Sequence, residues 1–356
     1  MRSVAFLFSS GRRQRLTNGG PGEFLYGFAE LARAGKPVAM FEEDDLGFGK
    51  PWPRLLEAAS ARVSHAAGVS PRLLPRLRSA IAGPLSPYDV LVATTQSIGM
   101  AIATLRAMGQ HDKRLILMTM GLVSPDASAW RRSLARKLLA GVDLAVLSRP
   151  EAASIRSWVG DRSRVHDFVF GVDVGFWTPG GTGAVSEEVL SIGNDPARDF
   201  ATLVAAWRPE FPRLSIITSQ SFFTDKPNVC VERGDWRQAA MTDEDVRERF
   251  RRARLVITPV IDTIQPSGQS ATLQAMACGR PVIMTRNRGL WDPEFMNEGV
   301  CRLVPPGDVD ALSHVIRSLL DDRAAAERMG TAARQAVVAH DVTSAGMARQ
   351  IERLAG

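Results

Sequence analysis

The residues best placed for chemistry follow a short apolar run at Val256–Pro259, where small and polar residues lead into a helical segment. Ser267 is predicted to cap this helix, which is expected from Gly268 to Ala277. The backbone N–H groups of Ser267–Ser270 would then be free at the end of a parallel sheet, where they can bind an anion. An ordinary crossover of an α/β sheet leaves the same groups free, so the spacing alone supports both interpretations.

The residues after this helix predict how it ends. Gly279 stands where a left-handed C-cap is expected, and Pro281 opens the next apolar run, Val282–Thr285. The whole stretch is therefore predicted to be one strand–helix–strand unit.

The sequence AMACGRPVI within this unit resembles the donor-binding segment of retaining glycosyltransferases of the GT-B fold, family-4 type (glycosyl transferases group 1). In that family one glutamate faces the donor sugar, and a second, eight residues later, holds the ribose hydroxyls. Pro266 and Gln274 stand at these positions here. The resemblance implies that Pro266, Ser267, Gly268 and Gln269 approach the donor sugar or phosphate and that Gln274 meets the ribose. A glutamine can accept a hydrogen bond from a hydroxyl, but it lacks the charge of a carboxylate.

A second matching position follows the predicted strand Glu188–Ile192. In the family, a glycine and two basic residues after this strand neutralise the donor diphosphate. Gly193 and Arg198 match the glycine and one basic residue, whereas Asn194 stands where the other, usually arginine, is expected. Two positive charges suit a pyrophosphate leaving group. A place on the helix surface is the alternative for Arg198, but a cation at a helix N-terminus has no favourable dipole interaction, which favours the anion role.

The stretch SSGRRQRLTNGGPGE follows the predicted strand Val4–Phe8 and is rich in glycine and basic residues. It is predicted to be the first loop of the chain. It contains neither a Rossmann fingerprint nor a P-loop. Its resemblance to the first loop of the same family implies that Gly19 and Gly20 let the backbone approach the donor diphosphate. A flexible connection is the alternative interpretation.

No catalytic residue is assigned. Many family members carry a histidine after the strand that corresponds to Arg114–Thr119, but this chain reads MTMGLVSPD there. His111 precedes the strand, so no catalytic role is transferred to it.

The elements that must position these residues follow one pattern, since short apolar runs alternate with helical stretches in both halves. The predicted fold is α/β, with two Rossmann-like domains facing across a cleft (GT-B) and parallel sheets flanked by helices. At 356 residues the chain suits two domains. We predict an acceptor-binding domain at 1–170, a nucleotide-sugar donor-binding domain at 171–340, and a last helix at 341–356 that packs on the first domain.

Composition limits the class of protein. Hydrophobic residues make up 45% and charged residues 23%, as in a globular protein. No apolar run approaches the ~18 residues that span a bilayer, and VAFLF is too short for a signal peptide. The three cysteines show no metal-ligand spacing and are expected to be buried thiols in a reducing compartment. We therefore expect a cytoplasmic protein with no cofactor and no metal.

The net charge of +6 raises the question of an acidic partner. Zinc-finger, RNP-like and helix-turn-helix patterns are missing, so nucleic acid ranks last. Basic helical stretches at Lys50–Ala82 and Trp130–Lys137 can lie on an anionic membrane, at its inner face for a cytoplasmic protein. Solvated helices that pack through their leucines are an equally good interpretation.

The resemblance implies a transferase that moves a sugar from a UDP- or GDP-type donor to an acceptor hydroxyl, with retention, in the synthesis of a glycan, polysaccharide or glycolipid. The donor would be a nucleotide sugar and the acceptor a glycan or a lipid-linked molecule. The alternative is a catalytically weak or inactive GT-B-fold protein that binds a nucleotide or a partner. A sugar-nucleotide epimerase or a nicotinamide oxidoreductase ranks lower, because the cleft motifs lack histidines and the glycine fingerprint is missing.

Overall fold

The computed structural model describes residues 1–47, 68–122, 128–160, 164–180, 186–233 and 241–356. The chain divides into two compact units. Unit 1 comprises Met1–Val169 and Ala345–Gly356, and unit 2 comprises Phe170–Ser344. The predicted borders were at 170 and 340. Within the described residues, each unit contains a six-stranded parallel sheet.

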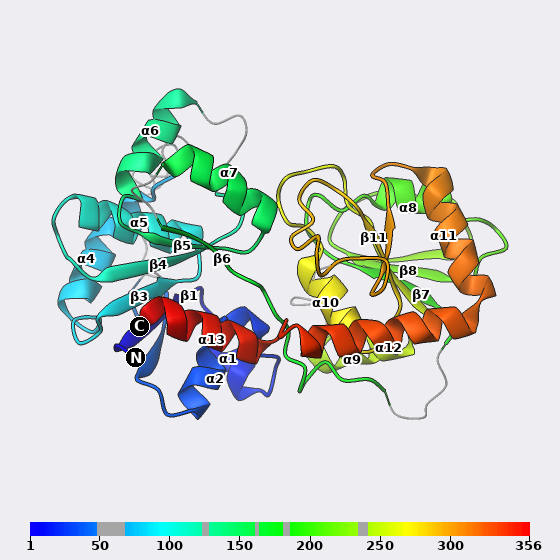
Figure 1. Cartoon of the computed structure of the whole chain (residues 1–356), viewed down its shortest axis with the longest axis horizontal. Coiled ribbons are helices and arrows are strands. Elements are labelled where there is room, and N and C mark those ends of the chain that lie inside the picture. The colour runs from blue at the N-terminus through cyan, green and yellow to red at the C-terminus, as the bar shows by residue number, and fades with distance from the viewer. Residues whose placement is uncertain (48–67, 123–127, 161–163, 181–185, 234–240) are drawn as a thin grey trace. The chain divides into compact units, whose positions relative to one another are not determined.

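Unit 1 has the strand order β2-β1-β3-β4-β5-β6 (Figure 1). Its strands are β1 (Val4–Phe8), β2 (Val38–Glu42), β3 (Val90–Ala93), β4 (Arg114–Thr119), β5 (Asp143–Val146) and β6 (Arg164–Asp167). Its helices are α1 (Arg12–Thr17), α2 (Phe28–Arg33), α4 (Leu74–Ala82), α5 (Gln96–Ala107), α6 (Ala129–Leu138), α7 (Arg149–Val159) and α13 (Ser344–Ala355), with 3₁₀ turns at Glu23–Leu25 and Pro71–Leu73.

The core of unit 1 lies on both faces of its sheet, as expected for parallel strands with continuous apolar runs. On one face Phe6 and Phe8 pack against Phe28 of α2, with ring centroids 5.5 and 6.2 Å apart. On the other face Leu7 and its neighbours belong to a buried cluster that includes residues of α4, α5, α6 and α7, such as Ile98.

Two predictions about the start of the chain were wrong. The first loop contains helix α1. The sequence after it predicts one helix from about Glu23 to Ala34, but this stretch is split into a 3₁₀ turn and α2. The break falls at Gly27, whose φ is 86°. A Cβ at Gly27 would lie 2.4 Å from the backbone nitrogen of Ala348. The close approach of α13 therefore requires glycine here, and glycine in a left-handed conformation interrupts the helix.

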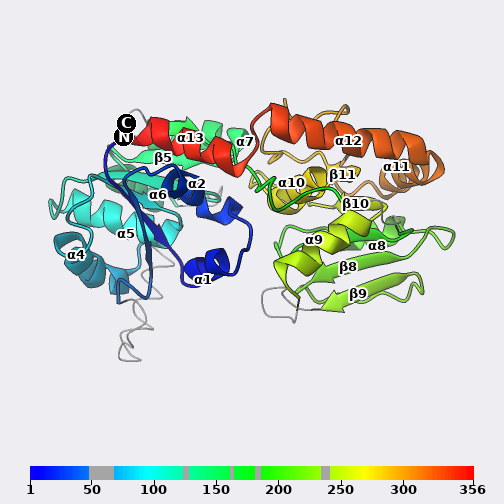
Figure 2. The ribbon, with the colours of Figure 1, turned by 90° about the horizontal axis from the view of Figure 1, so that it is seen from below.

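Helix α13 joins unit 1 through further contacts. The Lys36 ammonium pairs with Glu352. The Gln350 amide donates to the Val169 carbonyl (3.0 Å) and accepts from the Val169 N–H (2.9 Å). The two ends of the chain consequently lie side by side in unit 1 (Figures 1 and 2).

Unit 2 has the strand order β12-β11-β10-β7-β8-β9. Its strands are β7 (Val189–Ile192), β8 (Leu214–Thr218), β9 (Val229–Arg233), β10 (Leu255–Thr258), β11 (Val282–Thr285) and β12 (Arg302–Val304). Its helices are α8 (Phe200–Ala206), α9 (Asp243–Arg252), α10 (Gln269–Ala277), α11 (Val309–Asp321) and α12 (Arg323–Ala339). One buried cluster joins α8 and α11 to the sheet, and α12 packs along α10 (Figure 2).

Local sequence rules explain several helix ends in unit 2. The sequence predicts a helix over Asp243–Arg252 with Thr242 as its cap. Thr242 and Asp245 form a capping box at α9, which confirms this cap. At the end of α10, Gly279 has φ 72°, and the N–H groups of Gly279 and Arg280 donate to the carbonyls of Met276 and Ala275. This is the predicted left-handed C-cap.

The basic segments of unit 1 are only partly described. Of the stretch predicted at Lys50–Ala82, residues 48–67 lie outside the described residues, and the remainder includes α4. Trp130–Lys137 lies within α6, where the Trp130 side chain is 59% exposed. Within the described part of the chain, no helix has both the length and the apolar composition to span a bilayer.

Candidate functional site at the carboxyl edge of the second sheet

The strand order of unit 2 reverses between β7 and β10. Strands β8 and β9 lie on one side of β7, whereas β11 and β12 lie on the other side of β10. The chain therefore leaves these two adjacent strands in opposite directions. In open α/β sheets, this arrangement creates a ligand-binding crevice beyond the carboxyl ends of the strands.

The loops after β7 and β10 are bonded to each other at this point. The Asp199 N–H donates to the Pro259 carbonyl (3.1 Å), and the Ile261 N–H donates to the Ala197 carbonyl (2.9 Å). Arg198 and Val260 form an isolated antiparallel bridge. The two loops consequently hold Arg198 beside the start of α10.

The Arg198 side chain lies between two glycines. A Cβ at Gly193 would lie 2.4 Å from Nε of Arg198, and a Cβ at Gly268 would lie 3.1 Å from Nη1. A Cβ at Gly268 would also lie 2.3 Å from the methyl group of Thr258. Glycine at 193 and 268 therefore makes room for the guanidinium, which places three of the predicted site residues together.

The electrostatics of Arg198 are unusual. The residue is only 6% exposed. Burial lowers the pKa of its guanidinium from the ordinary value to about 10, and the charge of Asp195 opposes the shift. Among the described residues, neither Nε nor Nη1 has a hydrogen-bond partner. Burying a cation while two of its nitrogens lack hydrogen-bond partners is costly, so this position is suited to an anion.

The N-terminus of α10 lies beside this guanidinium. Gly268, with φ 78°, occupies the N-cap position and makes no side-chain capping bond, so the prediction that Ser267 caps the helix was wrong. Ser267 is 3% exposed, and its Oγ has no hydrogen-bond partner among the described residues. The left-handed turn at Gly268 moves the cap one residue further along the chain. A glycine at the N-cap position supplies no side chain to cap the first N–H groups of α10.

The other predicted donor residues of this unit lie on or next to α10. Pro266 is buried in the loop before the helix. Gln269 is the first residue of α10, and Gln274 lies near its middle. Both are buried, at 7% and 8% exposure. Their roles toward a sugar or ribose stay predictions.

Asn194 takes part in a structural contact. Its Oδ1 accepts a hydrogen bond from the Ser219 N–H (2.6 Å), and Gln220 of the same loop donates to the Asp195 carbonyl (2.6 Å). This amide therefore ties the loop after β8 to the loop after β7. The second positive charge that is typical of the family is missing at this position.

The glycine pair predicted to approach a diphosphate lies in unit 1. Gly19, with φ 76°, and Gly20 end helix α1: their N–H groups donate to the carbonyls of Leu16 (3.1 Å) and Arg15 (2.9 Å). Both amides are thus engaged in a C-terminal capping motif. A contact of this pair with a donor stays a prediction.

Unit 1 contains a buried carboxylate that the sequence analysis missed. Glu151 of α7 accepts hydrogen bonds from the N–H groups of Gly121 (2.7 Å) and Leu122 (2.9 Å). Burial raises the pKa of this carboxyl. These amides begin the loop where family members carry a histidine. His111, which was given no catalytic role, has its Nε2 3.1 Å from the Ile102 carbonyl.

The loop after β11, which contains two arginines, also borders the site. Both arginines have carboxylate partners: Arg286 lies 3.1 Å from Glu298, and Arg288 lies 2.9 Å from Asp262. Asn287, which lies between them, was not singled out. It is 6% exposed, and its Nδ2 donates to the Ile261 carbonyl (3.3 Å).

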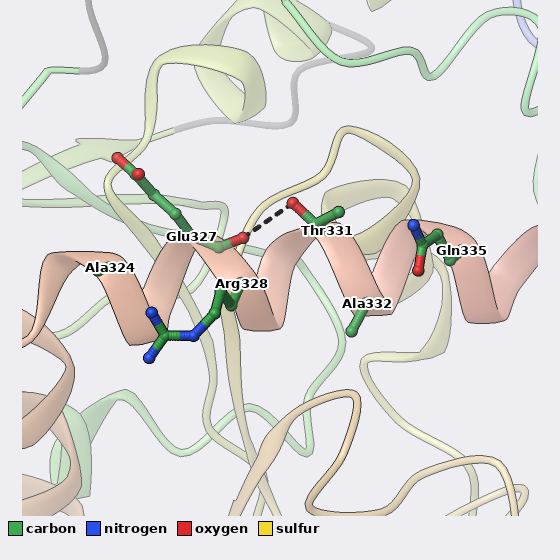
Figure 3. A pocket seen from close by; sticks show the side chains of 6 residues that line it. All are labelled: Ala324, Glu327, Arg328, Thr331, Ala332 and Gln335. Atoms are coloured by element: carbon green, nitrogen blue, oxygen red, sulfur yellow. Dashed lines mark hydrogen bonds between the residues drawn. The ribbon is translucent and has the colours of Figure 1, made fainter.

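A surface depression elsewhere in unit 2 has a different character. Figure 3 shows that its lining comes from a single face of α12, with side chains such as Glu327, Arg328 and Gln335. None of the predicted site residues lines it. Among the described residues, no group of three or more His, Cys, Asp or Glu side chains is arranged to hold a metal ion.

Known proteins resemble this chain in sequence and in fold. Residues 230–322 match the family described as "Glycosyl transferases group 1". The alpha-maltose-1-phosphate synthase of Mycobacterium tuberculosis is 26% identical over 207 residues, which cover 49% of this chain and 52% of that protein. The match thus spans about half the length of this relative.

Solved structures match nearly the whole chain. Sucrose-phosphate synthase from Thermosynechococcus elongatus has a TM-score of 0.70 at 20% identity, covering 99% of this chain and 98% of that one. HepE from Anabaena, in complex with UDP and glucose, has a TM-score of 0.67 at 15% identity, covering 99% of each chain. A glycosyltransferase from Rickettsia africae has a TM-score of 0.68 at 11% identity, covering 99% and 98%. The chain therefore has the GT-B fold of these structures, and residues 230–322 match the model of the glycosyl transferases group 1 family.

Proposed function

We propose that this chain is a retaining glycosyltransferase of family-4 type, which transfers a sugar from a nucleotide-diphosphate donor to an acceptor hydroxyl. The observation that carries the proposal is the buried Arg198, whose Nε and Nη1 have no partner among the described residues. It lies beside the uncapped N-terminus of α10, at the strand-order reversal of the sheet. A diphosphate supplies the negative charge that this position lacks.

Unit 2 would hold the donor. Arg198 would bind the diphosphate together with N–H groups at the start of α10, while Gln269 and Gln274 lie along the same helix as candidates for the sugar and ribose hydroxyls. HepE has been crystallised with UDP-glucose, which makes UDP-sugars the first donors to test here, with GDP-sugars next. The proposal requires no metal, because Arg198 and the helix N–H groups would balance part of the phosphate charge.

In the proposed reaction, the bond between the anomeric carbon and the β-phosphate oxygen breaks as the acceptor oxygen bonds to the same carbon from the same face. The acceptor proton passes to the departing phosphate. Arg198 stabilises the negative charge that develops on that leaving group, which is the largest charge change of the step. The absence of an assigned catalytic base is compatible with this route.

Unit 1 would hold the acceptor, a glycan or a lipid-linked molecule in polysaccharide or glycolipid synthesis. Helix α6 supports peripheral contact with an anionic membrane, because it carries Arg131, Arg132, Arg136 and Lys137, no acidic residue, and the exposed Trp130. We place the activity in the cytoplasm, where the free thiols of its cysteines would persist.

The test is a thermal-shift titration with UDP, GDP, ADP and dTDP, because a ligand that binds only the folded state raises the midpoint. A selective shift by one nucleotide is expected. Arg198→Ala should weaken that nucleotide by about 1.5–3 kcal/mol, the contribution of a charged hydrogen bond. Arg328→Ala, an exposed arginine on α12 of the same unit, is the matched control. Unchanged affinity in Arg198→Ala would remove Arg198 from the site, and no shift with any nucleotide would contradict the proposal.

The second candidate is a GT-B-fold protein with weak or no activity that binds a nucleotide or a partner. The observation in its favour is the position of Asn194, whose side-chain oxygen bonds the Ser219 backbone where the family usually has a second cation. Pro266 and Gln274, in place of acidic residues, point the same way. Sugar transfer or donor hydrolysis by the purified protein would exclude this candidate.

A further inference from the structure

Successive residues of the loop after β11 contact successive residues of the loop after β10. At the strand ends, the Val260 N–H donates to Oγ1 of Thr285 (3.0 Å). One step further, Nδ2 of Asn287 donates to the Ile261 carbonyl (3.3 Å). Both contacts bind backbone groups of the β10 loop to side chains of the β11 loop.

The next contact is an ion pair with two hydrogen bonds. Asp262 accepts from the Arg288 N–H through Oδ1 (3.1 Å) and from Nε of Arg288 through Oδ2 (2.9 Å). The side chains are 45% and 68% exposed, so the pair contributes little to global stability. Its geometry nevertheless fixes the backbone of the β11 loop relative to the Asp262 side chain.

The last contact is between backbones. A Cβ at Gly289 would lie 2.5 Å from the carbonyl oxygen of Gln265 and 2.7 Å from that of Thr263. Backbone atoms cannot swing aside as a side chain can. Any larger residue at 289 must therefore displace the β10 loop just before Pro266 and Ser267.

The opposite side of the β10 loop is bonded to the segment that carries Arg198. The Ile261 N–H donates to the Ala197 carbonyl (2.9 Å), while the Ile261 carbonyl accepts from Asn287 (3.3 Å). A single peptide segment therefore connects the Arg198 loop with the β11 loop. Five residues further on, this segment reaches Pro266 and then the N-terminus of α10.

We propose that Asn287, Arg288 and Gly289 are positioning residues for the anion site of unit 2. They hold residues 261–265 so that the first N–H groups of α10 and the Arg198 guanidinium face the same anion. This inference rests on the proposed function, because it concerns how the same site binds a nucleoside diphosphate. None of the three residues is required to touch the ligand.

The first variant to test is Gly289→Ala, measured by calorimetric titration of the full-length protein with UDP. We expect UDP affinity to fall more than about tenfold, because a shift of about 1 Å in a binding loop has large effects. Gly180→Ala is the matched control: it lies in the same unit, and its nearest neighbour would be a side-chain carbon of Arg251 at 3.4 Å. This control should bind UDP as the unmodified protein does.

The second variant keeps the test decisive if Gly289→Ala fails to fold. Asp262→Ala removes an exposed side chain, so the melting midpoint should stay unchanged while UDP affinity falls about tenfold. Asp262→Asn, which retains an acceptor for the Arg288 N–H, should recover most of that loss. A purely structural role would lower the midpoint and the apparent affinity together.

The outcomes separate the two proposals. If the unmodified protein binds UDP and the Asp262 and Gly289 variants bind it equally well, the positioning role is overturned and the proposed function stands. If the unmodified protein binds none of the four nucleotides, the proposed function fails and this inference fails with it.

Discussion

Asp143 in unit 1 and Arg198 in unit 2 are both buried charges, but within the described part of the chain they differ in their hydrogen-bond partners. The side chain of Asp143 is fully buried, yet it lies 2.8 Å from Arg114 and 2.9 Å from His166. Arg198 is 6% exposed, and its Nε and Nη1 have no partner among the described residues. A paired buried charge stabilises the structure around it, whereas an unpaired one lowers stability until a ligand supplies the counter-charge.

The two charges also lie at opposite edges of their sheets. Asp143 is the first residue of β5, at the amino edge, whereas Arg198 follows β7 at the carboxyl edge, where α/β folds bind ligands. At the carboxyl edge of unit 1, carboxylates of the same unit accept hydrogen bonds from backbone amides. Glu42 accepts from the Arg13 N–H of α1 (2.6 Å), and Glu151 accepts from two amides of the loop after β4. At the start of α10, by contrast, the N-cap residue Gly268 supplies no capping side chain. Two sheets of similar topology therefore differ at their carboxyl edges: in unit 1 carboxylates of the unit bind the amides named above, whereas in unit 2 two nitrogens of Arg198 have no partner among the described residues.

The largest expected effect comes from Arg198→Met, which removes the unpaired charge but keeps much of the side-chain volume. The free energy of unfolding of unit 2 should rise by about 1–3 kcal/mol, because the desolvation cost of the guanidinium disappears. The additional stabilisation by UDP should be lost. Urea unfolding with and without UDP measures both quantities, and Arg328→Met serves as an exposed control. A fall in stability would show that a partner stabilises the guanidinium, which would contradict the difference drawn between Asp143 and Arg198.

The next effect concerns the paired charge. Burial acts to raise the pKa of Asp143, but hydrogen bonds from Arg114 and His166 outweigh it, so the pKa lies below its ordinary value. A depressed pKa means that the carboxylate's contribution is present above the unfolded-state value of about 3.9 and is lost as the pH falls through the folded-state pKa.

Asp143→Asn should therefore lower the free energy of unfolding of unit 1 by about 1–2 kcal/mol at pH 7. The difference from the unmodified protein should shrink as the pH approaches 3. Denaturant unfolding at several pH values tests this dependence. A difference that is the same at pH 7 and pH 3 would mean that packing, not the charge, accounts for the effect.

A smaller effect is expected from Gln274→Glu, which gives α10 the carboxylate that its sequence lacks. If the site is a weakened donor site, UDP affinity should improve by about 1 kcal/mol, because a charged acceptor strengthens a hydrogen bond to a ribose hydroxyl. Isothermal titration of both proteins gives the comparison. An inactive scaffold should gain nothing, so an unchanged affinity would favour the second candidate function.

The smallest effect is expected in unit 1. Gly19→Ala places a side chain at φ 76° in open space, so it should cost about 1 kcal/mol of unit 1 stability. UDP affinity should stay the same, because the N–H groups of Gly19 and Gly20 already bond the end of α1. A measurable loss of UDP affinity would instead support a contact between this glycine pair and the diphosphate. Unit 1 would then also contribute backbone amides to ligand binding, in contrast to the difference drawn above.

Much of the fold was predictable because parallel α/β sheets have strong local signals. Buried apolar runs of four to six residues predicted strands such as β1 and β11, and capping rules predicted the start of α9 and the end of α10. One prediction failed because a distant segment decides the local conformation. Gly27 interrupts a helix because Ala348, more than 300 residues away, approaches its backbone.

The sequence by itself determined the α/β class, the alternation of strands and helices in both halves, and the position of Arg198 after a strand. These properties depend on local periodicity and turn chemistry, which neighbouring residues specify. Only the tertiary structure decided that Arg198 is buried between Gly193 and Gly268, and that Asn194 bonds a backbone amide. It also decided that the loop after β11 holds the loop after β10. These facts depend on how separate strands line up at one edge of a sheet, which strand order and close packing determine and local sequence does not.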